Sequence, residues 1–150
     1  MLMIINATGG GGESDGPIMT ISTISNLTSL DSWLADVHIG DRLCANYMGI
    51  SSSSDRVIGL DVDVIRITGT TNITVYFAGA LSCYISSDSY YHLAKNFSIS
   101  YNTSTNQVSG ISWKYTASSS PPTSTTSKSL SRSNIGTFST VIGIHRGVSS

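Results

Sequence analysis

The chain has 150 residues, enough for one ordinary domain, and charged residues make up only 11% of it, against about 25% in a typical soluble domain. Serine and threonine fill the gap, with 29 and 16 residues. Their hydroxyl groups compete with the helix backbone for hydrogen bonds and suit strands and turns. The composition therefore argues against a mainly helical protein and favours an all-β class with polar loops.

The charge is unevenly divided along the chain. Residues 1–88 hold all nine acidic residues and three arginines, a net charge of −6, whereas residues 89–150 hold five cationic residues and no acid. Two such halves can attract each other within one fold or between subunits. The five cationic residues form no cluster, so we expect no nucleic-acid binding.

The start of the chain gives no sign of membrane targeting. No apolar run approaches the roughly 18 residues that a transmembrane helix needs. The apolar stretch Met1–Ile5 is shorter than the apolar core of a signal peptide and has no basic residue before it. We expect no signal peptide, no membrane association and synthesis in a cytoplasm.

Residues 1–16 are expected to form an N-terminal strand with a flexible Gly-rich anchor, and residues 17–150 a β-rich domain. Four consecutive glycines follow the apolar stretch Met1–Asn6, and they disfavour both helix and strand. In the second unit, Pro17–Leu27 alternates apolar and hydroxyl residues, which predicts a strand.

One helix is expected, at Ser29–Ile39. Its apolar residues follow the spacing of one helical face: Leu30, Trp33, Leu34 and Val37. Thr28 or Ser29 can cap its start and Gly40 can end it. A helix of about three turns is expected to cover one open end or face of a sheet.

The remaining chain reads as strands separated by polar turns. Strands are expected at Arg42–Ile50, Arg56–Thr68, Ile73–Ile85, Asn96–Tyr101, Gln107–Thr116 and Phe138–His145. In Arg56–Thr68 the alternation breaks at Ile65–Ile67, which indicates a β-bulge. In Ile73–Ile85, Gly79 marks a bend. Asn102–Asn106 predicts a hairpin loop, and the Ser/Thr/Pro-rich segment Ala117–Asn134 an extended loop.

About eight strands at short spacing, with one short helix, predict an all-β single domain. The architecture expected for such a pattern is a β-sandwich or a small barrel. The polar segment at 117–134 has almost no apolar residue to bury. If it is ordered, a neighbouring subunit is expected to hold it, which favours a homo-oligomer.

No arrangement of catalytic residues stands out. The chain has no G-x-S-x-G elbow, Walker A loop, H-E-x-x-H or C-x-x-C motif. With 29 serines, a Ser–His–Asp combination is expected from counts alone and carries no information. We therefore expect no enzyme and no cofactor.

Two pairs of residues carry side chains of the kinds that bind metal ions. Asp61 and Asp63 lie on one side of a strand, about 7 Å apart, but no further acidic cluster lies nearby, and charges on an exposed strand also discourage edge pairing. Cys44 and Cys83 have no second Cys or His at ligand spacing and are expected to be free thiols. We expect no metal site.

Aromatic residues are the better binding candidates. Tyr90 and Tyr91 lie beside a polar loop, and Trp113 lies near the predicted hairpin. Exposed tyrosine and tryptophan rings can stack on sugars or fill a protein interface. The alternative is that these rings point inward as part of the core of the sheet.

The first 16 residues, MLMIINATGGGGESDG, resemble the openings of small tail, fibre and head-accessory proteins of tailed bacteriophages, in which a short apolar strand precedes a Gly-rich link. The remaining chain is similar to such proteins in its Ser/Thr/Gly-rich, charge-poor composition. The resemblance carries over no functional residue. It implies a virion structural protein that anchors through one terminus, oligomerises, with a trimer favoured, and docks to other virion proteins.

The leading hypothesis is a non-enzymatic virion structural subunit of decoration, adaptor or fibre-associated type. The chain lacks coiled-coil heptads and repeated fibre motifs, which favours a compact decoration or adaptor domain over a long shaft. The alternative is a carbohydrate-binding β-sandwich module that holds a glycan on Tyr90, Tyr91 or Trp113. A third reading, a secreted surface or pilus-type subunit, would need an upstream leader.

Overall fold

A computed structural model of the chain describes residues 2–6, 18–116 and 125–147, with only the backbone for residues 2–6 and 18. The described strands form one ten-stranded antiparallel sheet in the order β1-β2-β10-β3-β4-β5-β6-β7-β8, with the short β9 beside β3. The elements are β1 (Leu2–Asn6), β2 (Ile18–Ile24), α1 (Leu27–Leu34), β3 (Arg42–Gly49), β4 (Arg56–Thr68), β5 (Asn72–Ile85), β6 (Tyr90–Asn102), β7 (Gln107–Thr116), β8 (Thr125–Ser131), the 3-10 turn η1 (Arg132–Asn134), β9 (Thr137–Ser139) and β10 (Val141–Arg146).

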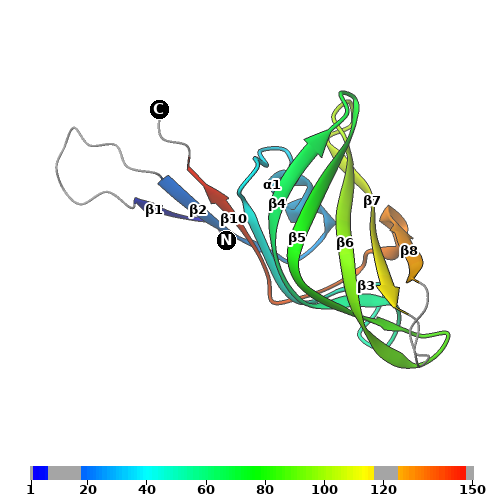
Figure 1. The fold of residues 1–150 in the computed structure, drawn as a ribbon. Coiled ribbons are helices and arrows are strands. Elements are labelled where there is room, and N and C mark those ends of the chain that lie inside the picture. Colours follow the sequence, from blue (N-terminus) through cyan, green and yellow to red (C-terminus); the bar gives the residue numbers. More distant parts are fainter. Residues whose placement is uncertain (1, 7–17, 117–124, 148–150) are drawn as a thin grey trace.

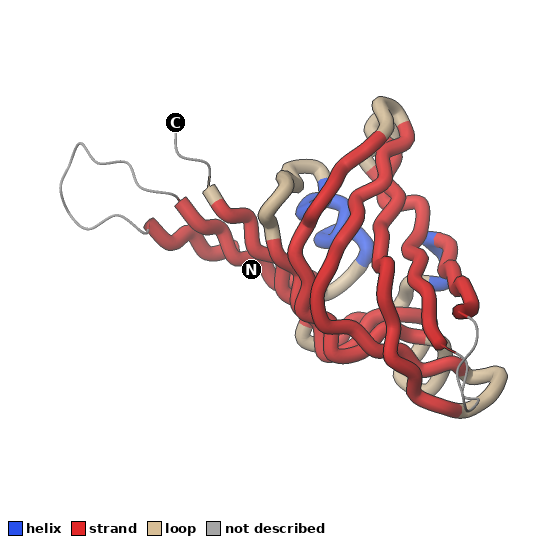
Figure 2. Tube along the Cα trace, in the orientation of Figure 1, coloured by secondary structure: helices blue, strands red, loops and turns tan. Residues whose placement is uncertain are grey.

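The sheet is strongly curved and has two parts. Strands β3 to β8 wrap around α1 and form the body, while β1, β2 and β10 extend from it as an arm (Figures 1 and 2). Within the described residues β1 and β8 end the hydrogen-bonded order, so the sheet is open. Full closure alone removes the unpaired edges of a sheet, and here both edges remain.

These observations confirm the expected all-β single domain with one short helix. They also refine its architecture, because the described strands belong to one bent sheet that does not close into a barrel. The curvature places the inner faces of distant strands around one core. Trp33 of α1 stacks near Phe77 of β5 and on His145 of β10, so one helix fills the space that the sheet encloses.

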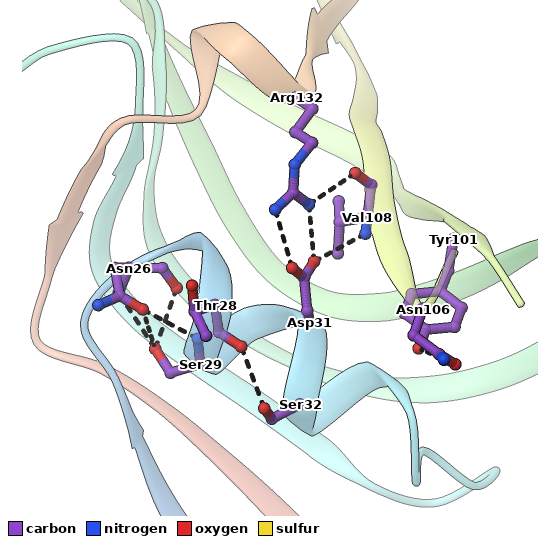
Figure 3. Close-up of polar contacts among 9 residues, drawn as sticks. All are labelled: Asn26, Thr28, Ser29, Asp31, Ser32, Tyr101, Asn106, Val108 and Arg132. Carbon is purple, nitrogen blue, oxygen red and sulfur yellow. Dashed lines mark hydrogen bonds and ion pairs between the residues drawn. The ribbon is translucent and has the colours of Figure 1, made fainter. Parts of the chain in front are cut away.

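The helix is shorter than expected and begins earlier. Its N-cap is Asn26, whose side chain accepts a hydrogen bond from the Ser29 backbone N–H, while the Ser29 hydroxyl accepts one from the Asn26 N–H (Figure 3). This reciprocal capping box satisfies two backbone donors that the first turn leaves free. The expectation that Thr28 or Ser29 caps the helix was wrong, because the N-cap lies two or three residues earlier; Ser29 is instead the N3 residue of the capping box. The helix ends at Leu34, and not at Gly40.

The strand at Arg56–Thr68 has the expected bounds, and its register shifts at Val64/Arg66, where the alternation breaks. The ladder between β5 and β6 lapses between Tyr76 and Ser82, around the predicted bend at Gly79. β6 begins at Tyr90, six residues before the expected start at Asn96. In its first half the buried position is taken by His92 while Tyr91 and Leu93 are exposed, so the apolar alternation on which the prediction depended was missing.

The expected loop at 117–134 was wrong for its described part. Thr125–Ser131 forms β8, which pairs with β7 along its whole length, and η1 follows at Arg132–Asn134. This strand is held by backbone hydrogen bonds and by one buried side chain, Leu130. Because its other side chains are not buried, the sequence lacks the apolar alternation that predicts a strand. Residues 117–124 and the Gly-rich anchor at 7–16 lie outside the described residues.

The last expected strand, Phe138–His145, is two strands. β9 pairs with β3 at Thr137–Ser139, and β10 pairs with both β2 and β3. Thr140, which separates them, has a φ of 49°, a conformation that ends regular pairing for a β-branched residue. The chain changes direction there, so β10 can enter the arm.

Ion pairs join the acidic and basic parts of the chain within one molecule. Asp31 of α1 pairs with Arg132 of η1, and Asp55 pairs with Lys128 of β8. The uneven charge distribution is thus partly neutralised inside the fold. No helix among the described residues has the length and apolar character needed to cross a bilayer.

Candidate functional site

The three predicted binding residues do not form one site. Tyr90 and Tyr91 are exposed, at 60% and 63%, but Trp113 is only 1% exposed and lies in the core. For Trp113, the inward-facing alternative is the correct one, and the ring offers no open face for stacking. Tyr91 points to the outer face of the sheet, where it contacts other aromatic residues.

Tyr91 belongs to a patch around Arg56. The Arg56 guanidinium lies 4.6 Å from the centre of the Tyr84 ring. Its distances to the centres of the Tyr47 and Tyr91 rings are 5.8 and 6.0 Å. Arg56 also donates hydrogen bonds to the Ser54 carbonyl and the Tyr91 hydroxyl. The rings already surround the cation, which stabilises it in a nearly buried place. Leu93, 80% exposed two residues after Tyr91, extends the patch as an apolar contact surface.

A groove of about 870 Å³ lies on the outer face over β4 to β8. It forms where β5 and β6 separate between the pairs Tyr76–Ser98 and Ser82–Leu93. Gly79 has a φ of 149° and Asn96 a φ of 56° there. Left-handed backbone and interrupted pairing bend a sheet locally, so the bend itself creates the groove.

Hydroxyl groups form a row across the groove. Ser98 of β6 lies opposite Ser112 of β7, which lies opposite Ser129 of β8. The hydroxyl oxygens of Ser112 and Ser129 are 2.9 Å apart and share a hydrogen bond. At the other end of this row, Tyr76 of β5 lies opposite Ser98. Serine hydroxyls both donate and accept hydrogen bonds, so the row suits a ligand rich in hydroxyl groups.

Three cationic side chains line the same groove, and no acidic residue does. The guanidinium of Arg66 lies 4.1 Å from the centre of the Tyr76 ring. Lys95 and Lys114 lie directly opposite each other on β6 and β7. None of the three has an ion pair within the part of the chain that the structure describes. The groove is therefore a positively charged, hydroxyl-lined surface.

A second hollow, of about 680 Å³, lies between α1 and the arm and is lined mainly by hydroxyl residues. His145 lies at its edge, and its Nδ1 is 2.6 Å from a carboxylate oxygen of Asp41. Asp41 is fully buried and also accepts hydrogen bonds from the backbone N–H groups of His38 and Arg146. The described residues show no hydroxyl bonded to His145 Nε2, so this pair lacks the nucleophile of a hydrolytic triad. It ties β10 to the turn before β3.

Asp61 and Asp63, the paired carboxylates of β4, lie beside an arginine. Arg42 Nε donates to Asp61 at 2.7 Å, and Asp63 lies opposite Arg42 in the ladder. This hydrogen bond lowers the pKa of Asp61, as expected for a carboxylate beside a cation. In the described part of the chain, no three His, Cys, Asp or Glu side chains gather as metal ligands. Cys44 and Cys83 are free thiols.

Sequence reasoning missed the groove, although one signal for it was present. The signal is Gly79, which predicted a bend in this strand, but the sequence does not indicate that the bend interrupts the pairing of β5 with β6 or that Arg66 stacks on Tyr76. The hairpin predicted with a loop at Asn102–Asn106 would pair Tyr101 with Gln107 and would bring Lys95 opposite Trp113. In the structure Asn102 pairs with Gln107 and two bulges further along compensate each other, so Lys95 lies opposite Lys114 instead.

Comparisons with known proteins add no relative: no family model, no curated protein and no solved structure matches this chain.

Proposed function

We propose that the chain is a non-enzymatic structural subunit that acts by assembly with copies of itself and with other proteins of a larger particle. The proposed particle is a virion, because the first 16 residues resemble those of tailed-phage proteins. The observation that carries the proposal is the arm of β1, β2 and β10, which extends from the body (Figure 1), and on which β2 and β10 carry half-buried apolar side chains.

The arm has two different faces. Thr20 and Ser22 of β2 and His145 of β10 lie on the side of α1, where they line the second hollow. The opposite face carries four half-buried apolar residues, together with Thr23 and the exposed Arg146 at its two ends: Met19, Ile21, Ile142 and Ile144. Ile21 and Ile144 lie directly opposite each other. This apolar stripe has no covering element among the described residues, and such surfaces are typical of interfaces.

Among the strands that the structure describes, the arm also ends in an open edge at β1. The unpaired backbone groups of an edge strand can pair with another chain. Charged residues, which proteins use to prevent such pairing, are scarce in this chain, at 11%. An apolar stripe beside an open edge suits a second copy of the same arm, which presents the same stripe and the same edge.

The proposal predicts a defined multimer of the purified protein when its mass is measured by light scattering after size exclusion: a dimer if the stripes of two arms face each other, or the trimer that the resemblance implies if each arm contacts a different surface of the next copy. The double variant Ile21→Lys/Ile144→Lys should shift it to a monomer of 15.8 kDa, because two charges in the stripe oppose its burial. Ile21→Thr/Ile144→Thr, which keeps strand propensity, should weaken assembly with less risk to folding.

Thr105→Lys, in the exposed β6–β7 turn, is the matched control and should keep the wild-type mass. Circular dichroism confirms that each variant is folded. A wild-type protein that stays monomeric at every concentration contradicts the proposal, and so do folded lysine and threonine variants that both keep the multimer mass.

A carbohydrate-binding module is the second candidate, and the outer groove favours it. Tyr76 and the hydroxyl row provide an aromatic ring beside hydrogen-bonding groups, a combination that suits sugars. Tyr76→Ala should abolish binding on a glycan array if the groove holds the glycan, whereas Tyr91→Ala should do so if the Arg56 patch does. Trp113→Ala is no clean test, because this buried ring stabilises the fold. An array on which the wild-type protein binds nothing contradicts this candidate.

A further inference from the structure

We propose that the groove over β4 to β8 is a binding site for an acidic oligosaccharide, one whose sugars carry carboxylate groups. The inference deepens the second candidate function and rests on it, because it names the class of glycan. It is independent of assembly through the arm, which lies at the other end of the sheet order.

The first argument is the lysine pair. Lys95 and Lys114 are directly opposite on neighbouring strands, and both are exposed. Like charges in this position repel each other and destabilise the sheet. The described residues supply no carboxylate to either lysine. An anionic group bound between the two ammonium groups would remove this repulsion, so the pair favours an anionic ligand over a neutral one.

The second argument is the position of Arg66. Stacking on Tyr76 at 4.1 Å orients its guanidinium plane and leaves its N–H donors without an ion pair among the described residues. An oriented guanidinium binds a carboxylate through two parallel hydrogen bonds. Arg66 and the lysine pair lie two strands apart, on β4 and β6, which is roughly 10 Å or more. They would therefore contact carboxylates on different sugars, so the ligand is an oligosaccharide and not a single acidic sugar.

The third argument concerns the surface between the cations. Ser98, Ser112 and Ser129 supply hydroxyl groups across three strands. These match sugar hydroxyls, which also donate and accept. A nucleic acid fits less well, because its recognition on a sheet uses open aromatic faces for base stacking. Successive bases need several open rings, and of the aromatic residues that line this groove Phe77, Phe97 and Trp113 are buried, which leaves Tyr76 alone among the described residues.

The test is isothermal titration calorimetry of the full chain with oligogalacturonate, an oligomer of carboxylated sugars. Neutral dextran and single-stranded poly-dT are the comparison ligands. The expected result is saturable binding of oligogalacturonate that weakens with salt. Arg66→Gln and Lys95→Gln/Lys114→Gln should each weaken it about tenfold or more, the loss expected for a charge-assisted hydrogen bond.

Arg146→Gln is the matched control, because Arg146 is exposed on the arm and its side chain has no ion pair among the described residues. It should bind as the wild-type protein does. Equal losses in Arg146→Gln and the groove variants overturn the site, because they would report only the net charge.

The failure of the inference and of the function on which it rests can be told apart. If dextran or another neutral glycan binds and oligogalacturonate does not, the inference of an acidic ligand is overturned, but the carbohydrate-binding function stands. Failure of every glycan to bind overturns both. Tighter binding of poly-dT than of oligogalacturonate, lost in the same groove variants, replaces the carbohydrate with a polynucleotide and overturns the inference.

Discussion

At the scale of single residues, the carboxylate of Asp31 connects three elements of the body. One oxygen accepts a hydrogen bond from the Val108 backbone N–H on β7, and both oxygens accept from the Arg132 guanidinium in η1, each at 2.8 Å (Figure 3). Arg132 also donates to the Val108 carbonyl. These contacts fasten α1 to the strand that it covers and to the segment that follows β8.

Asp31→Ala should lower the free energy of unfolding by about 2 kcal/mol, because it leaves a half-buried guanidinium and a backbone N–H without their acceptor. Urea denaturation followed by tryptophan fluorescence measures this change. Asp36→Ala, an exposed aspartate just after the same helix, is the control and should change the free energy by less than about 0.5 kcal/mol. Equal effects of the two substitutions would show that the Asp31 contacts add nothing.

Asp55 makes stability depend on pH. Burial raises the pKa of this carboxyl, but hydrogen bonds from Lys128 and Ser86 lower it more, so its pKa in the folded state lies below the ordinary value. A lowered pKa stabilises the folded state above the unfolded-state pKa of about 3.9, and this contribution is lost as the pH falls through the folded-state value.

Asp55→Asn and Lys128→Met should therefore reduce the loss of stability on acidification. The measurement is the urea midpoint at about pH 5 and about pH 3, on either side of the ordinary aspartate pKa. Lys114→Met, which removes a cation without an ion pair among the described residues, is the control and should keep the wild-type difference. A wild-type difference in all three variants would mean that Asp55 does not contribute.

The two thiols should differ in reactivity. Burial raises the pKa of Cys83 to about 11, and Cys83 is fully buried. Burial also raises the pKa of Cys44, which is only half-buried. Because the thiolate is the reactive form, iodoacetamide at mildly alkaline pH should label Cys44 slowly and Cys83 only after unfolding in urea. Mass spectrometry of tryptic peptides locates the label, and rapid labelling of Cys83 in the folded protein would contradict its burial.

At the scale of elements, the bend of β5 depends on Gly79. Its φ of 149° is rare for other residues, and a Cβ atom there would clash with the Asp61 carbonyl oxygen of β4. Gly79→Ala should therefore lower the free energy of unfolding by about 2 kcal/mol or more. In Gly136→Ala the added Cβ would meet nothing closer than the Ile50 carbonyl oxygen at 3.9 Å, so this control should stay near wild type. Thermal unfolding of both variants checks the difference.

Elements that bury a regular row of apolar side chains were predicted correctly, whereas elements held mainly by backbone hydrogen bonds were not. β4 was predicted with its bounds because Leu60, Val62 and Val64 are buried on one face while Asp61 and Asp63 are exposed on the other. β8 was missed because it is an edge strand that needs only backbone pairing and one buried leucine. The start of α1 was misplaced because several capping residues follow one another there, and only the backbone geometry at Asn26 selects among them.

At the scale of the whole molecule, the charge distribution does less for assembly than the sequence indicated. Asp31 pairs with Arg132 and Asp55 with Lys128 within one chain, so these opposite charges are already used inside the fold. The arm, by contrast, exposes the apolar stripe of β2 and β10. Burial of apolar surface is not weakened by screening, whereas exposed ion pairs are.

The multimer proposed above should therefore keep its mass in high salt. Light scattering at low salt and at about 1 M NaCl, where charges more than about 3 Å apart are screened, measures this. The bovine-serum-albumin peak run in both buffers controls for column effects. Dissociation in high salt would place the subunit contacts on the charged surfaces instead of on the arm.

The sequence by itself determined the class of the fold, the positions of the clearest strands and the apolar face of the helix, because alternation and helical spacing are local properties of the chain. The tertiary structure decided which strands share one open sheet, which aromatic rings are buried, and where Arg66 lies relative to Lys95 and Lys114. These features depend on the curvature of the sheet, and curvature is the combined result of bulges and left-handed residues on several strands. No single stretch of sequence contains it.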